Sequence, residues 1–141
     1  MLKGIDPLLR GELLRALDEM GHGQKFALVD RNFPAFQSGT PVIDLGEVNA
    51  TRATEAIMAV FPLDAFVDSP LERMGADSDL SEENEAQSGV RIAANKSAAS
   101  RWEWKVIPRL EFYDAIREAA LVVRCLEDAP YACFLFRKGV I

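Results

Sequence analysis

The sequence has few of the residues from which metal centres and disulfide frameworks are built. Among 141 residues there is one histidine, His22, and there are two cysteines, Cys125 and Cys133. Two cysteines do not make a disulfide framework, and a histidine far upstream of them gives no zinc-ligand spacing. We therefore expect no bound metal ion, and we expect both thiols to stay reduced in a reducing cytosol.

Long apolar runs and an excess of positive charge are also missing. No apolar run approaches the roughly 18 residues that cross a bilayer. Asp6, Glu12, Asp18 and Glu19 interrupt the segment in which a signal peptide would have its apolar core. Acidic residues outnumber basic ones by 22 to 16, which gives a net charge of -6 and no electrostatic attraction to nucleic acid or to an anionic membrane. These features predict a cytoplasmic protein that binds neither.

The chain length and the hydrophobic share of 49% predict one domain, residues 1–141, with a core of its own. Helices are expected at 7–20, from a cap at Asn49 or Thr51 to about residue 61, and at 108–118. Strands are expected at 26–29, 41–45, 63–68, 102–107, 119–123 and 133–136. Phenylalanines are expected in the core at 61, 66, 134 and 136. Residues 75–100 are expected to form a solvated region of helix and loop that contributes no catalytic or binding chemistry.

Strands that alternate with helices predict an α/β fold with three α/β/α layers. The central sheet should be mostly parallel, and the turn at Pro130 indicates that one strand runs antiparallel. No glycine-rich phosphate loop of the P-loop or GxGxxG type is present, so the sequence predicts no nucleotide cofactor.

His22 is the main candidate for chemistry. It lies between Gly21 and Gly23 in a helix-to-strand loop, where small neighbours let a ligand approach the imidazole. Asp30 follows the next expected strand, at a position where α/β proteins often bind ligands. A histidine held by a carboxylate can transfer protons near neutral pH. The alternatives are that His22 caps the preceding helix and that Asp30 forms an Asx turn.

Arg109 and Tyr113 lie four residues apart on one expected helix and should share a face. A guanidinium beside an aromatic ring can hold a polyhydroxylated ligand. The alternative is a surface salt bridge beside a core aromatic. Tyr131 follows a predicted turn and could equally be an exposed turn residue.

Several segments in order resemble the RbsD/FucU family, the D-ribose pyranases and L-fucose mutarotases. They are the opening M-L-K-G-I-D-P-L-L followed by a helix and E-M-G-H-G, V-D-x-N-F-P at 29–34, R-x-x-F-Y at 109–113, A-P-Y-A at 129–132 and K-G-V-I at 138–141. The R-x-x-F-Y segment is more similar to the fucose mutarotase branch, because the ribose pyranase branch has a histidine in that region.

The resemblance implies an enzyme without metal or cofactor that interconverts the anomers of a free monosaccharide, with L-fucose as the expected sugar. It implies that His22 is the proton donor and that Asp30, Arg109, Tyr131, Ala132 and Cys133 bind substrate. The family usually has asparagine where this chain has Cys133. It also implies a ring-shaped homo-oligomer, commonly a decamer, with sites shared between neighbouring subunits.

Three further functions stay open on the sequence, and one of them is a purely structural assembly protein that binds no sugar. A D-ribose pyranase would convert pyranose to furanose forms. A sugar-binding transport accessory protein would bind without catalysis, which the change at Cys133 would permit. In the catalytic hypothesis, His22 is oriented by Asp30 or by a sugar hydroxyl that both contact.

Overall fold

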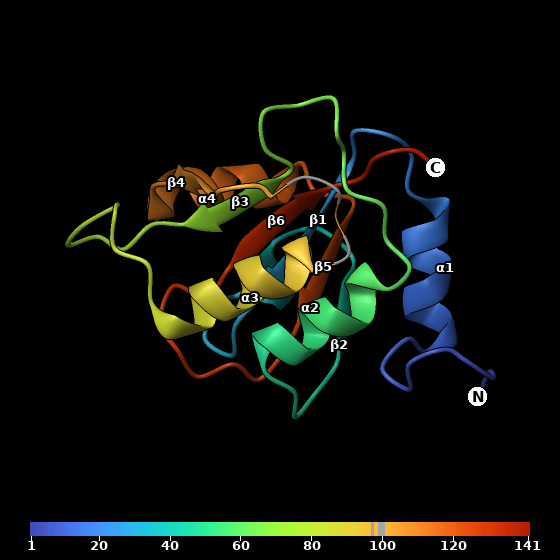
Figure 1. The fold of residues 1–141 in the computed structure, drawn as a ribbon. Coiled ribbons are helices and arrows are strands. Elements are labelled where there is room, and N and C mark those ends of the chain that lie inside the picture. Colours follow the sequence, from blue (N-terminus) through green and yellow to red (C-terminus); the bar gives the residue numbers. More distant parts are fainter. Residues whose placement is uncertain (97, 99–100) are drawn as a thin grey trace.

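The computed structural model of the protein describes residues 1–96, 98 and 101–141. They form a six-stranded sheet with helices on both faces (Figure 1). The helices are α1 (Gly11–Glu19), α2 (Ala50–Met58), α3 (Glu85–Asn95), α4 (Arg109–Arg117) and the short 3-10 helix η1 (Ala35–Gln37). The strands are β1 (Lys25–Val29), β2 (Val42–Asp44), β3 (Leu71–Met74), β4 (Lys105–Ile107), β5 (Leu121–Arg124) and β6 (Phe134–Arg137). Among the described helices, none has the length and apolar character needed to span a membrane.

The sheet has the strand order β2-β5-β1-β6-β3-β4. Five strands share one direction, and β6 runs antiparallel to both of its neighbours, β1 and β3. The predicted α/β fold with one antiparallel strand is confirmed. The carboxyl ends of β1 to β5 therefore meet the amino end of β6 at one edge of the sheet. The amino ends of the five strands meet the carboxyl end of β6 at the opposite edge.

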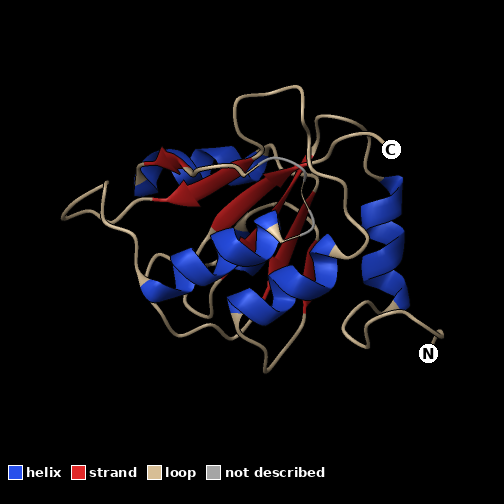
Figure 2. Ribbon diagram, viewed as in Figure 1, coloured by secondary structure: helices blue, strands red, loops and turns tan. Residues whose placement is uncertain are grey.

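Side chains of β1 alternate between two cores, as a central strand requires. Phe26 and Leu28 pack with residues of α1, α2 and α3, whereas Ala27 and Val29 pack with residues of α4. Figure 2 shows the helices on both faces of the sheet. All four side chains are fully buried. This arrangement confirms the predicted three layers.

The first helix is shorter than its apolar spacing predicts. It begins at Gly11 rather than at Pro7, because Asp6 accepts a hydrogen bond from the Leu8 amide and so closes a turn instead of capping the helix. Leu13 and Leu17 of α1 are buried as expected. The second helix begins as predicted, since the Asn49 side chain accepts from the Arg52 amide at the N-cap.

The prediction of a strand at 63–68 is wrong. Only Leu63 forms an isolated bridge, to Lys138, and the Asp64 carboxylate then accepts the Phe66 amide in a local turn. Phe66, expected in the core, is 76% exposed. The strand of this region is β3, which was missed because its central residues are Glu72 and Arg73. Both are buried, and Glu72 is paired with Lys25 at 2.7 Å.

The expected solvated region at 75–100 contains α3, of which one face is buried; residues 97, 99 and 100 of that region lie outside the described residues. Gln87, Val90, Ala93, Ala94 and Asn95 are buried on that face. The strand expected from Trp102 begins only at Lys105. Trp104 nevertheless stacks on Phe134, with ring centroids 5.3 Å apart.

We expect Phe136→Ala to lower the free energy of unfolding by about 3–5 kcal/mol, because the ring is fully buried against Phe26. Phe36→Ala is the matched control, since Phe36 is 70% exposed, and it should change stability by no more than about 0.5 kcal/mol. Urea unfolding followed by circular dichroism measures both. Equal effects of the two substitutions would contradict the assignment of the core.

Candidate functional site

His22 lies in the tight loop that joins α1 to β1. Gly23 has a φ of +85°, and its amide donates to the Lys138 carbonyl, so the loop turns sharply beside the carboxyl end of β6. The Lys138 ammonium donates to the carbonyls of Leu17, Asp18 and Met20, at 2.6–3.3 Å. Lys138 thus satisfies the end of α1, which is the capping role that the alternative hypothesis gave to His22.

The imidazole of His22 is paired with a carboxylate. Its Nε2 lies 3.3 Å from Asp64 Oδ2, which also accepts from Arg137 Nε at 2.8 Å. Burial acts to raise the pKa of Asp64, but the hydrogen bonds from the Phe66 amide, Arg137 and His22 outweigh it and hold this pKa below its ordinary value. Asp64 is therefore ionised near neutral pH. Because it occupies Nε2, it leaves Nδ1 of His22 for a ligand.

The surroundings of His22 combine open space and aromatic surface. The side chain of His22 is 46% exposed and the ring of Phe66 meets it edge to face, with centroids 5.8 Å apart. His22 also lines a hollow of about 440 Å³, together with Leu14, Phe61 and Val140. A small polar molecule with an apolar face can reach the imidazole from this side.

Asp30 lies at the other end of β1. It is 5% exposed, and its Oδ1 accepts the amides of Asn32 and Phe33 at 2.9 and 3.0 Å, which is the predicted Asx turn. Burial raises the pKa of Asp30 despite these bonds. Burial, with the Asp30 charge beside it, also raises the pKa of the Cys133 thiol well above its ordinary value. The thiol is therefore protonated, and its sulfur lies 3.5 Å from Asp30 Oδ2 as a donor.

Tyr131, Ala132 and Cys133 form the turn that leads into β6. Tyr131 has a φ of +56°, a left-handed backbone conformation that residues other than glycine rarely adopt. Such conformations often occur at functional sites. Ala132 is fully buried, and the Cys133 carbonyl accepts the Met74 amide at 2.9 Å. The turn is therefore fixed to the carboxyl ends of β1 and β3.

Arg109 begins α4, directly after β4. Its Nε donates to both carboxylate oxygens of Asp77, at 2.9 and 3.2 Å, and its guanidinium lies 6.0 Å from the centre of the Tyr113 ring. The hydrogen bond to Asp77 raises the pKa of Arg109. Arg109 and Tyr113 share a helix face as predicted. In one chain, Arg109 makes the surface ion pair of the alternative hypothesis.

These residues divide into two groups at opposite edges of the sheet. Asp30, Arg109 and the 131–133 turn lie at the edge where the parallel strands end, and His22 lies at the edge where they begin. The five residues of β1 alone separate His22 from Asp30 by about 17 Å. The hypothesis that Asp30 orients His22 is therefore wrong within one chain, since Asp64 holds that position.

Comparison with known proteins shows the family. The model of the RbsD / FucU transport protein family matches residues 3–141. An L-fucose mutarotase from Glaesserella parasuis serovar 5 is 37% identical over 145 residues, which cover 99% of this chain and 96% of that protein. The chain belongs to the RbsD/FucU family.

Solved structures of RbsD/FucU proteins have the same fold. FucU from Bifidobacterium longum is 30% identical with a TM-score of 0.92, and the match covers 99% of each chain. A fucose mutarotase from Streptococcus pneumoniae, solved in complex with L-fucose, is 27% identical with a TM-score of 0.88 and the same coverage. The resemblance seen in the sequence motifs is thus confirmed over the whole chain.

Sequence reasoning missed three residues of this RbsD/FucU protein: Asp64, Arg137 and Lys138. Asp64 was placed in a strand that does not exist, and its partners come from distant segments. The Asp64-Ala65-Phe66 stretch carried one usable signal, because aspartate commonly accepts the amide two residues later. In residues 1–96, 98 and 101–141, no three His, Cys, Asp or Glu side chains cluster as metal ligands do.

We expect Asp64→Asn to lower stability at neutral pH, because it removes the charge that Arg137 and His22 share. A carboxyl whose pKa is depressed by folding contributes stability above its unfolded pKa, about 3.8, and loses it as the pH falls through the folded value. The stability gap between wild type and variant should therefore shrink below pH ~3.8. Urea unfolding from neutral to strongly acidic pH measures the gap. Asp68→Asn, an exposed residue of the same loop, is the control, and a gap independent of pH would contradict the pairing.

Proposed function

We propose that the protein is a sugar mutarotase that interconverts the anomers of L-fucose by metal-free acid–base ring opening. The observation that carries this is the imidazole of His22, which is half exposed beside a hollow and held through Nε2 by an ionised carboxylate. The full-length similarity to L-fucose mutarotases supports the same reaction and sugar. It does not favour a D-ribose pyranase or a binding protein without catalysis.

The chemistry needs one proton to leave the anomeric hydroxyl and one to arrive at the ring oxygen. The bond between C1 and the ring oxygen then breaks, the free aldehyde rotates about C1–C2, and ring closure returns both protons. His22 supplies through Nδ1 the proton that the ring oxygen receives, and the imidazole then accepts the proton that leaves the anomeric hydroxyl, so no net proton is gained or lost. Asp64 holds the ring in place through Nε2 during both transfers. A positioned acid–base group of this kind accelerates a reaction by about 10²–10⁴-fold.

We further propose that each site forms between subunits of a cytoplasmic homo-oligomer, a decamer by the family resemblance, with 1–141 as one domain in each subunit. One chain keeps His22 and Arg109 at opposite edges of its sheet, so a sugar cannot contact both in that chain. A neighbour that presents its His22 edge to the Asp30 edge would complete the site. Asp30, Arg109, Tyr131, Ala132 and Cys133 would then hold the sugar while the neighbour's loop transfers the proton.

His22→Ala should leave the fold intact and slow exchange between the anomers of L-fucose by about 10²–10⁴-fold. Saturation-transfer NMR of the two anomeric signals measures the exchange, and a thermal melt checks the fold. Glu12→Ala, an exposed residue of α1, is the control and should keep the wild-type rate. An unchanged rate in His22→Ala removes His22 from the mechanism, and an inactive wild type contradicts the proposed function.

A mixing experiment tests the shared site. His22→Ala and Arg109→Ala subunits, each nearly inactive alone, are combined one to one, dissociated and reassembled. Random assembly pairs an intact His22 with an intact Arg109 in about a quarter of the shared sites, so activity should return to that extent. Each variant taken alone through the same cycle is the control. A mixture no more active than its components would contradict a site between subunits.

A further inference from the structure

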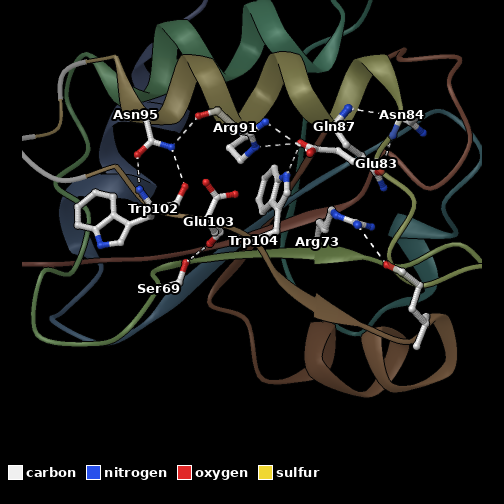
Figure 3. Close-up of polar contacts among 11 residues, drawn as sticks. Ser69, Arg73, Glu83, Asn84, Gln87, Arg91, Asn95, Trp102, Glu103 and Trp104 are labelled. Carbon is white, nitrogen blue, oxygen red and sulfur yellow. Dashed lines mark hydrogen bonds and ion pairs between the residues drawn. The ribbon is translucent and has the colours of Figure 1, made fainter.

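The amino end of α3 is attached to the Tyr131 turn through two side-chain amides, the buried one of Gln87 and the half-buried one of Asn84. Gln87, in the first turn of α3, is 1% exposed although it is polar, and its side chain lies close to Asn84 (Figure 3). Its Nε2 donates to the Met74 and Tyr131 carbonyls, each at 3.0 Å. The Asn84 Nδ2 donates to the Pro130 carbonyl at 2.8 Å. Two successive carbonyls of the turn are thus bound by two side chains from one helix end.

The same two side chains also cap α3, but they do so with their oxygen atoms. Asn84 Oδ1 accepts the Gln87 amide at 2.9 Å, and Gln87 Oε1 accepts the Asn84 amide at 3.0 Å. Aspartate at the N-cap and glutamate at N3, the position of Gln87, would supply these acceptors equally well, and glutamate is common at N3 of a capping box. The nitrogen donors distinguish asparagine and glutamine from those acids. Within the described residues, these donors bond to the backbone carbonyls of Pro130, Tyr131 and Met74, at or beside the turn.

The conformation of Tyr131 explains why the turn needs such bonds. A left-handed backbone at a residue with a side chain persists only where its surroundings hold it. Asp30 binds one side of the turn through Cys133, and α3 binds the other side through the carbonyls of Pro130 and Tyr131. If the bonds from α3 were lost, the backbone would relax toward negative φ and the phenol would point elsewhere.

We propose that Gln87 and Asn84 are positioning residues that hold Tyr131 in its left-handed conformation and so present its phenol to the sugar. This inference rests on the proposed function, in which Tyr131 contacts the substrate. It assigns a role in sugar affinity to a helix end that does not itself touch the sugar. Loss of the nitrogen donors should weaken sugar binding while proton transfer by His22 continues, so KM should rise and kcat should stay nearly constant.

Three variants separate positioning from stability in the full-length oligomer. Gln87→Met keeps the side-chain volume and removes both N–H donors together with the Oε1 acceptor of the helix cap. Asn84→Asp keeps the helix cap and removes only the donor to Pro130. Asn95→Leu is the matched control, because Asn95 is a buried amide at the other end of α3 that bonds to Trp102 and not to the turn (Figure 3). Anomer exchange is measured by saturation-transfer NMR over a range of L-fucose concentrations.

We expect Gln87→Met to raise KM about tenfold and Asn84→Asp to raise it by a smaller factor, with kcat within about twofold of wild type. Asn95→Leu should lower the melting temperature without raising KM. An unchanged KM in both Gln87→Met and Asn84→Asp overturns the inference. If the wild type is active in the same experiment, the proposed function still stands. An equal rise of KM in Asn95→Leu also overturns it, because general destabilisation would then explain the effect.

A second measurement does not depend on activity. The chain has two tyrosines, so labelling with ¹³C,¹⁵N-tyrosine gives separate signals for Tyr131 and for Tyr113, which serves as an internal reference. The Cα shift of Tyr131 should move from left-handed toward extended values in Gln87→Met and stay in place in Asn95→Leu. A Tyr131 shift that does not move in Gln87→Met contradicts the positioning role whether or not the wild type is active.

Discussion

The direction of β1 constrains how the candidate residues can act together. This strand is central, is paired on both sides, and is buried along its whole apolar run, so it cannot bend to bring its ends together without breaking two ladders of hydrogen bonds. His22 precedes it and Asp30 follows it. Each edge of the sheet therefore has its own chemistry: a carboxylate-bound imidazole beside a hollow at one, and a buried carboxylate under a strained turn at the other.

Apolar periodicity predicted the elements whose stability comes from burial of apolar side chains. The strands β1, β5 and β6 and the helix α4 lie within a few residues of their predicted positions for this reason. Apolar periodicity did not reveal a strand in which a charged side chain is buried beside a partner. β3 contains Glu72, whose charge is compensated by Lys25 from β1, and no local pattern reveals such a partner. The opposite error at 63–68 arose because Asp64 binds its own backbone more favourably than a strand would allow.

Motif positions located the loops of the candidate site, whereas the contacts of each side chain needed the structure. Asp64 meets His22 and Arg137 only because β6 returns beside β1 and Leu63 bridges to Lys138 at the end of β6, so these contacts are a product of topology. Cys133 shows the same dependence. Its thiol donates to Asp30, and its carbonyl accepts a backbone amide, so the turn keeps its attachment to both neighbouring strands without the asparagine that the family usually has there.

The modest size of this site agrees with what mutarotation requires. The closed and open forms of a sugar carry the same net charge, so the protein does not have to stabilise a large charge in the way that phosphoryl transfer or peptide hydrolysis demands. An imidazole that a carboxylate such as Asp64 holds in one orientation is sufficient to transfer the two protons. The remaining requirement is to hold the sugar still while one ring bond opens. Backbone bonds meet that requirement better than long flexible side chains do, because less conformational freedom is lost when the sugar binds. The buried amide of Gln87 and the left-handed turn at Tyr131 therefore agree with a site that binds the sugar through a rigid backbone rather than through charge.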